Sequence, residues 1–163
     1  MKKWITILII LAMITWIACT KGGKLERIAG ESYAVNATAS SKQLVPAIDT
    51  TSTGTLTGFY DAQANILTYT ITWNDLWRDT KKDTIVSVSF YGPATASANG
   101  TLVRSLPFVN LNRAGTVNLG LAGITGFTAE EKKNFLAGAY YFTIDTKRYP
   151  NGIVRGQLTA TKK

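Results

Sequence analysis

The sequence predicts an all-β domain: a two-sheet antiparallel β-sandwich with Greek-key, immunoglobulin-like connections, about eight strands and one short helix near 128–137. Three observations support this prediction. Short runs of residues alternate between apolar and polar side chains. Turns rich in Gly, Pro, Asn and Asp separate these runs at short intervals. The composition, 45% hydrophobic with abundant threonine and aromatic residues, is that of an ordered β protein.

The clearest strand signal lies at residues 67–73. Leu67, Tyr69, Ile71 and Trp73 fall on one face, and three threonines fall on the other. Strict alternation of this kind predicts a half-buried antiparallel strand. Comparable patterns predict further strands at 33–39, 54–60, 86–91, 102–108, 117–121, 140–145 and 153–161.

One helix interrupts the strand pattern. Thr128 precedes Glu131 by three residues, which is the spacing of a capping box. Phe135 gives the helix an apolar side, and Gly138 can end it in the left-handed conformation. We therefore expect a helix of two to three turns that packs over an edge of the sandwich.

The amino-terminal segment predicts export. Lys2 and Lys3 precede an apolar run from Trp4 to Ala18, as in a signal peptide. A membrane-spanning helix needs about 20 apolar residues, so this run is too short to span. The predicted organisation is a signal peptide at 1–18, a flexible lipid-attached tether at 19–30 and a folded domain at 31–161.

Cys19 is the only cysteine, and it directly follows the apolar run. Ile17, Ala18 and Cys19 resemble the lipobox of bacterial lipoproteins, whereas Trp16 replaces the usual leucine. Cleavage at another position, or retention of the segment as an anchor, therefore stays an alternative. The resemblance implies that Cys19 carries a diacylglycerol, and two or more acyl chains hold a protein stably in a membrane. We expect a membrane-anchored lipoprotein at the periplasmic face or cell surface, with no disulfide in its domain.

The net charge is +8, and loss of Lys2 and Lys3 with the signal peptide would leave +6. The basic residues are scattered or paired, and no aromatic–basic stripe accompanies them, so nucleic acid is not an expected partner. The expected partners are the membrane, through the lipid, and either an envelope polysaccharide or another envelope protein.

Several local sequences together resemble the CHRD (chordin-type) domain family. The most specific is YPNGIVRGQL at 149–158, and the resemblance covers nearly the whole domain. It implies a β-sandwich of largely unknown molecular activity. The other matching segments are 43–46 with 53–54, 67–69, 91–94 and 138–141.

The chain departs from this family at its histidines. The family shows His-x-His before a Gly-Pro, a His in the penultimate strand and a Glu after the final turn. These positions are Ser89, Tyr91, Asp145 and Ile153 here, and the chain contains no histidine. We therefore predict no transition-metal site and no cofactor, although a degenerate metal-binding domain stays an alternative.

Ser89, Tyr91, Asp145 and Arg155 are the main candidate ligand-binding residues. Alternation places Ser89, Tyr91 and Asp145 on polar faces, and a hairpin turning through 147–151 makes Asp145 and Arg155 diagonal neighbours across two strands. This pair predicts either a binding cluster for an anionic or hydroxyl-rich ligand or, more simply, a cross-strand ion pair. Trp77 is a further candidate, as an aromatic platform for sugar rings.

No catalytic constellation is found in the sequence. It has no histidine, no spare cysteine, no nucleophile elbow and no phosphate loop. Glu130 and Glu131 are adjacent on a helix, so they cannot face each other as glycosidase carboxylates do. We expect a non-catalytic, lipid-anchored envelope module that acts by binding or as a structural accessory, with a carbohydrate-binding module as the alternative.

Overall fold

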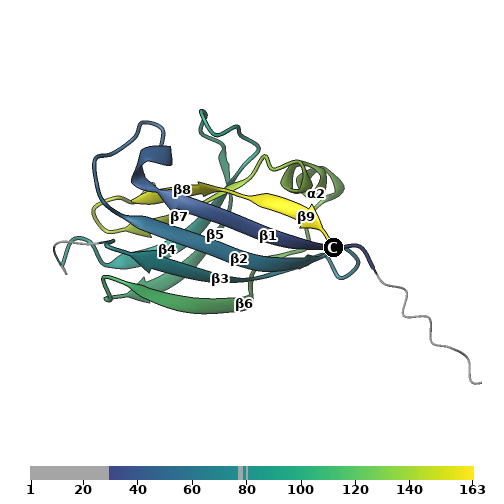
Figure 1. Ribbon diagram of the computed structural model, residues 1–163, viewed down its shortest axis with the longest axis horizontal. Coiled ribbons are helices and arrows are strands. Elements are labelled where there is room, and N and C mark those ends of the chain that lie inside the picture. The colour runs from purple at the N-terminus through teal and green to yellow at the C-terminus, as the bar shows by residue number, and fades with distance from the viewer. Residues whose placement is uncertain (1–29, 77–78, 80) are drawn as a thin grey trace, which may run out of the picture.

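The computed structural model describes residues 30–76, 79 and 81–163, without the side chains of 119–125. These residues form an antiparallel β-structure with one α-helix beside it (Figure 1). The strands are β1 (Ser32–Ser40), β2 (Thr53–Asp61), β3 (Ile66–Asn74), β4 (Ile85–Gly92), β5 (Thr101–Asn110), β6 (Gly115–Thr125), β7 (Tyr141–Thr146), β8 (Val154–Gln157) and β9 (Thr159–Lys162). A 3-10 turn, η1, covers Ser41–Gln43, and the helix α2 covers Ala129–Leu136.

Each predicted strand overlaps an observed one, but the last is divided. The expected strand 153–161 becomes β8 and β9, because the backbone N–H of Leu158 turns to donate to the carbonyl of Tyr140 at 2.8 Å. After this break the chain continues beside β1, where β9 pairs Asn36 with Thr159. The division therefore lets one carboxy-terminal segment continue along two different stretches of β1.

The expected arrangement of two separate sheets is not confirmed. The strands form one antiparallel sheet in the order β5-β4-β7-β8-β1-β2-β3-β6, with β9 also paired to β1. The connection between the two halves is β1, which pairs with β2 along its whole length and with β8 at Ser40↔Arg155. The sheet curls until its end strands β5 and β6 approach each other, so it resembles a half-barrel more than a sandwich.

The hydrophobic core fills the inside of this curl. On β3, Leu67, Tyr69, Ile71 and Trp73 are all buried, as the alternation predicts, and the threonines between them are partly exposed on the outer face. Val88 and Phe90 from β4 and Phe142 and Ile144 from β7 meet this surface from the other half of the sheet. Burial of these side chains is the main stabilising contribution, at roughly 25 cal/mol per Å² of apolar surface.

Helix α2 covers one end of the core, and its cap is the predicted one. The Thr128 hydroxyl accepts from the N–H of Glu131 at 3.2 Å, and the Glu131 carboxylate accepts from the N–H of Thr128 at 2.8 Å. Gly138 follows the helix with φ of +75°. Phe135 is fully buried and packs edge-on against Tyr60, with 5.1 Å between ring centroids.

Strand β7 is buried on both of its faces. Its inner face contacts the core, whereas its outer face is covered by the segment 41–52, the 93–100 loop and the 147–152 turn. Those connections leave a pocket against the sheet, lined by residues from all three. A second layer of polar and aromatic side chains thus lies outside the sheet, and it is here that the candidate residues meet.

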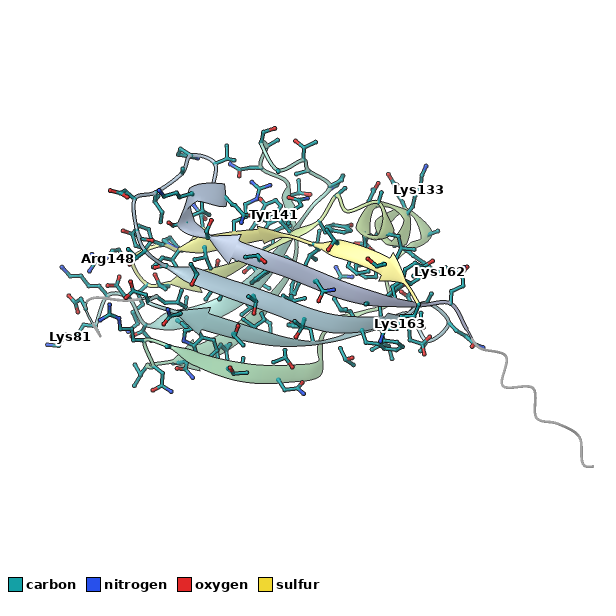
Figure 2. All side chains as sticks on the ribbon, viewed as in Figure 1. Lys81, Lys133, Tyr141, Arg148, Lys162 and Lys163 are labelled. Atoms are coloured by element: carbon teal, nitrogen blue, oxygen red, sulfur yellow. The ribbon has the colours of Figure 1, made fainter. Side chains whose placement is uncertain are left out.

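No helix within the described part of the chain is long and apolar enough to cross a membrane. The signal peptide, the tether and Cys19 lie outside the described residues, apart from Gly30. Lys81, Lys133 and Lys162 are exposed at separate points around the molecule (Figure 2). This arrangement agrees with the scattered basic charge in the sequence.

Candidate functional site

The candidate site lies on the outer face of three neighbouring strands. Strand pairing sets Ser89 beside Thr143 and Thr143 beside Arg155, so side chains from β4, β7 and β8 form continuous rows. The predicted register of the last hairpin is confirmed, and Asp145 and Arg155 are diagonal neighbours. The outer-face residues are Ser87, Ser89 and Tyr91 on β4, Tyr141, Thr143 and Asp145 on β7, and Arg155 on β8.

Asp145 is the centre of a buried hydrogen-bond cluster. Ser87 and Ser89 donate to one carboxylate oxygen, at 2.6 and 2.5 Å, and Thr143 donates to the other at 2.6 Å. The residue is 2% exposed. Burial raises the pKa of Asp145, although the three hydroxyl donors oppose the rise. Both oxygens are therefore occupied, which makes Asp145 a structural group beneath the site and not an accessible base.

Arg155 does not pair with Asp145, so the simpler expectation of a cross-strand ion pair is wrong. The guanidinium instead lies over the ring of Tyr141, 3.6 Å from its centroid. It donates to the carbonyl oxygen of Thr95 at 2.8 Å and more distantly to Gln157 and Asn99. The serine and threonine hydroxyls satisfy Asp145, and the ring and loop carbonyl draw Arg155 away from it.

Tyr91 and Tyr141 form a stacked aromatic pair at the site. Tyr91 stacks on Tyr141 with ring centroids 5.2 Å apart and planes inclined by 10°. The Tyr141 hydroxyl accepts from the backbone N–H of Gly100 at 3.2 Å, which fixes the ring against the 93–100 loop. Burial, followed by the charge of Asp145, raises the pKa of Tyr91. Its phenol is therefore neutral at physiological pH and can both donate and accept a hydrogen bond.

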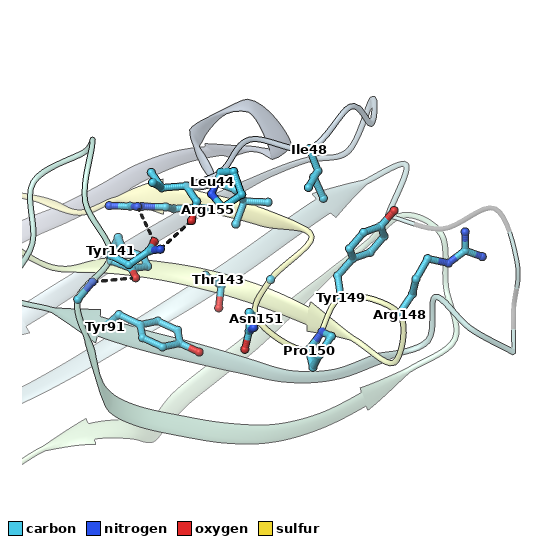
Figure 3. Close-up of a pocket in the computed structure, with 15 residues that line it drawn as sticks. Leu44, Ile48, Tyr91, Tyr141, Thr143, Arg148, Tyr149, Pro150, Asn151 and Arg155 are labelled. Atoms are coloured by element: carbon cyan, nitrogen blue, oxygen red, sulfur yellow. Dashed lines mark hydrogen bonds between the residues drawn. The ribbon is translucent and has the colours of Figure 1, made fainter.

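A pocket of about 500 Å³ opens above these side chains (Figure 3). Tyr91, Thr143 and Arg155 line it from the sheet, and the apolar side chains of Leu44 and Ile48 line it from the segment 41–52. Tyr149, Pro150 and Asn151 border it from the last turn, together with Arg148. The volume suits one small molecule or one sugar unit of a longer chain.

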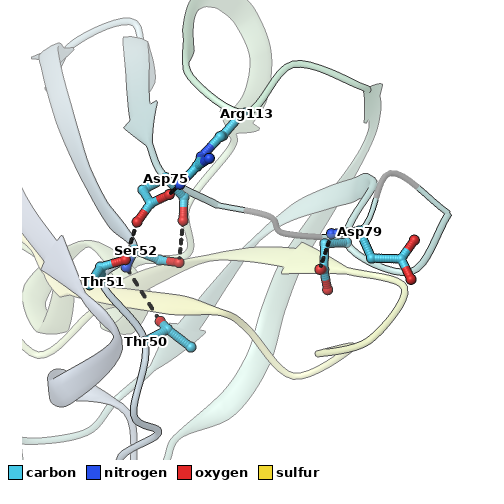
Figure 4. A network of polar contacts seen from close by, with 7 residues as sticks. Thr50, Thr51, Ser52, Asp75, Asp79 and Arg113 are labelled. Carbon is cyan, nitrogen blue, oxygen red and sulfur yellow. Dashed lines mark hydrogen bonds and ion pairs between the residues drawn. The ribbon is translucent and has the colours of Figure 1, made fainter.

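The covering segment 41–52 is anchored by polar contacts at its base. The hydroxyl of Ser52 donates to the backbone carbonyl of Asp75 at 2.7 Å, and the Asp75 carboxylate accepts from Thr51 and from Arg113 (Figure 4). At the other end, the hydroxyl of Ser41 donates to the carbonyl of Thr50 at 2.7 Å. These bonds hold the apolar wall of the pocket in place.

The turn at 149–152 joins β7 to β8 and places Tyr149 at the edge of the pocket. The N–H of Gly152 donates to the carbonyl of Tyr149 at 3.1 Å, and Gly152 has φ of +107°. The predicted turn is therefore present. Arg148, beside Tyr149, pairs with the buried Asp83 at 2.7 Å. Tyr149, which belongs to this turn, also borders the pocket.

The predicted residues divide into two layers. Tyr91 and Arg155 line the pocket, whereas Ser89 and Asp145 lie beneath it and support its floor. Trp77 lies outside the described residues.

Sequence reasoning missed Tyr141 and the apolar side chains of Leu44 and Ile48. Tyr141 could have been found, because it shares the outward phase of Thr143 and Asp145. Leu44 and Ile48 belong to an irregular segment, and no periodicity indicates where such residues fold.

The site offers binding groups and few reactive ones. Its lining contains arginine, asparagine, threonine and tyrosine, and the chain has no histidine. Within residues 30–76, 79 and 81–163, no group of three or more Cys, Asp or Glu side chains could hold a metal ion. Hydrogen bonding, ring stacking and charge are the interactions that this surface provides.

The comparisons with known proteins agree with the resemblance found in the sequence. None of the curated proteins and none of the solved structures matches the chain. The family model described as the CHRD domain matches residues 35–158, which includes every strand that builds the site. The chain therefore belongs to the CHRD domain family.

Proposed function

We propose that this protein is a non-catalytic, lipid-anchored module of a bacterial envelope, and that its CHRD domain binds a small ligand in the outer-face pocket. The observation that carries the binding role is the pocket of about 500 Å³, which tyrosine rings and arginine line together with apolar side chains. Protein pockets for small ligands combine apolar walls with a few polar groups in this way.

A non-catalytic role agrees with the chemistry of the site. Catalysis of acyl or glycosyl transfer requires an accessible nucleophile, base or acid. Asp145, which lies beneath the pocket, is buried and accepts three hydroxyl donors. Turnover by wild-type protein on hydrolytic, redox or isomerase substrate panels, abolished by Arg155→Gln, would overturn this part of the proposal.

The lipid anchor rests on Cys19 and on the apolar run before it. Mass spectrometry of protein extracted from native membranes should find an amino-terminal Cys19 bearing a diacylglyceryl group. The control is Cys19→Ser, which should leave the membrane fraction because it has no thiol to acylate. An unmodified, unprocessed amino terminus on the wild-type protein would contradict the anchor.

The binding role needs a screen that assumes no ligand class. A thermal-shift screen of wild-type protein against a broad metabolite and glycan library should find ligands that raise its Tm, because a ligand selective for the folded state stabilises it. Tyr149→Ala should weaken these shifts, since Tyr149 borders the pocket. Hits that are indifferent to Tyr149→Ala, or a screen without hits, would contradict the binding role.

Carbohydrate is a second candidate for the ligand, favoured by the aromatic lining. Tyrosine faces stack on the C–H groups of sugar rings, and Asn151 and Thr143 can bond hydroxyls. A glycan array should show binding that falls with Tyr149→Ala. Trp77→Ala belongs in the same array, because the sequence singles out Trp77 as a sugar platform. Binding that falls with Trp77→Ala and not with Tyr149→Ala would assign the sugar to Trp77 in place of Tyr149.

A further inference from the structure

Arg155 is a buried cation with an unusual environment. It is 1% exposed and is among the largest fully buried side chains of the described residues. A charge removed from water is unfavourable unless another charge or a full set of hydrogen bonds compensates it. The identity of its partners therefore decides what this residue contributes.

All of those partners are neutral. They are the carbonyl oxygen of Thr95, the side-chain oxygens of Gln157 and Asn99, and the ring face of Tyr141. Among the residues that the structure describes, ion pairs involve Arg104, Arg113, Arg148 and Lys162, but not Arg155. The positive charge of Arg155 thus lacks a counter-charge within the described chain.

Some N–H groups of the guanidinium have no acceptor among the described residues. It carries five N–H groups, and the acceptors in contact with it are bonded through Nη1 and Nη2. In the described part of the chain, Nε donates to no acceptor. Burial lowers the pKa of Arg155, yet arginine stays protonated at physiological pH.

The pocket beside Arg155 is complementary to a negative charge. The described residues that line it include Arg148 and Arg155 and no carboxylate. The charge of Arg148 is already balanced by Asp83 at 2.7 Å, so Arg155 is the uncompensated cation of the site. Asp145 is the diagonal neighbour of Arg155 across β7 and β8, but its carboxylate accepts hydrogen bonds from three hydroxyls and none from Arg155.

From this geometry we infer that the ligand carries a carboxylate or phosphate group, which enters the pocket and supplies the counter-charge of Arg155. Guanidinium groups recognise both anions through charge-assisted hydrogen bonds, for which the N–H of Nε is the donor without an acceptor among the residues described. The remainder of the ligand lies against Tyr149 and the apolar wall of Leu44 and Ile48. The inference rests on the proposed function and names the chemical class of the ligand.

Three probes that share one ring test this inference on the full chain. They are D-glucuronate, which carries a carboxylate, glucose 6-phosphate, which carries a phosphate, and neutral D-glucose. Titration calorimetry at constant ionic strength should show at least one of the anions binding about tenfold to a hundredfold more tightly than glucose. The preferred anion distinguishes a sugar acid from a sugar phosphate.

Two charge-removing variants locate the effect. Arg155→Gln should reduce the preference for the anion to about that of glucose, whereas Lys133→Gln, which removes the same charge from an exposed position on helix α2 away from the pocket, should retain it. If Arg155→Gln fails to fold, the ¹⁵N resonance of the Arg155 guanidinium in wild-type protein replaces it. That resonance should shift with the bound anion and stay unchanged with glucose.

The outcomes separate this inference from the proposed function. Equal or tighter binding of glucose would overturn the inference and leave the pocket as a binding site. Failure of all three probes would also overturn it, whereas the proposed function depends on the separate library screen. Anion binding that survives Arg155→Gln, or that leaves the guanidinium resonance unmoved, would assign the anion to the general basic surface and contradict the role of Arg155.

Discussion

Two buried tyrosines in the core should respond oppositely to the loss of one oxygen atom. Tyr69 is 2% exposed, and its hydroxyl has no hydrogen-bond partner among the described residues. Tyr60 is fully buried, and its hydroxyl donates to the side-chain oxygen of Asn65 at 2.8 Å. Substitution by phenylalanine removes the hydroxyl and leaves the ring packing in place. The pair therefore isolates the hydrogen bond from the hydrophobic contribution.

The expected magnitudes follow from these environments. An unsatisfied buried hydroxyl costs about 1–3 kcal/mol, so Tyr69→Phe should raise the free energy of unfolding by about 1 kcal/mol. Its ring keeps the edge-on contact with Phe90 at 5.3 Å. A satisfied hydrogen bond contributes about 1 kcal/mol, so Tyr60→Phe should lower the free energy of unfolding by about that amount and leave Asn65 short of a donor. The two variants should differ by about 2 kcal/mol.

Urea denaturation followed by tryptophan fluorescence measures this difference. The slope of the free energy against urea should be the same in both variants, because a single oxygen changes little exposed surface. The reasoning would be refuted if Tyr69→Phe destabilised the protein as much as Tyr60→Phe does. That result would mean that the Tyr69 hydroxyl has a partner in solution.

Three further predictions concern the buried carboxyl, the helix cap and the last turn. Burial raises the pKa of Asp145 above its unfolded value, so the folded state favours the protonated carboxyl and wild type loses stability from this residue as the pH rises from about 4. The free energy of unfolding of Asp145→Asn relative to that of wild type should therefore increase between pH 4 and 8 in urea titrations, and a decrease would contradict the raised pKa. Thr128→Ala removes the hydroxyl that caps helix α2, so the free energy of unfolding should fall by about 1 kcal/mol while ligand binding stays the same. An unchanged unfolding midpoint would show that the cap contributes nothing to stability. Gly152→Ala should lower the free energy of unfolding by more than about 1 kcal/mol in the same assay, because φ of residue 152 is +107° and a Cβ there would lie 2.9 Å from Thr143. A variant as stable as wild type would show that this position tolerates a side chain.

Local structure could be predicted from the sequence because local rules determine it. The alternation at 67–73 reflects one buried and one outer face, and Thr128 and Glu131 form the cap that their spacing indicates. The joining of the two halves of the sheet could not be predicted in this way. It depends on β8 pairing with β1, more than 100 residues earlier in the chain, and β9 adds a second stretch of the same pairing after a break at Leu158. Periodicity contains no information on such long-range pairing.

The candidate site was predicted in position but not in detail. Strand phase and hairpin register placed Ser89, Tyr91, Asp145 and Arg155 on one surface, where the structure also has them. Which groups pair depends on the 93–100 loop and on Tyr141, which draw Arg155 away from Asp145. A side chain of this length can reach several acceptors, so backbone register alone does not decide its partner.

The most direct test of the account is a crystal structure of the protein bound to D-glucuronate or to glucose 6-phosphate, whichever binds more tightly. The account predicts the anionic group of the sugar in the outer-face pocket, within hydrogen-bonding distance of the Arg155 guanidinium, and the sugar ring against Tyr149. A sugar bound on the threonine-bearing outer face of β3, or one in the pocket with its anionic group directed to solvent, would contradict the account.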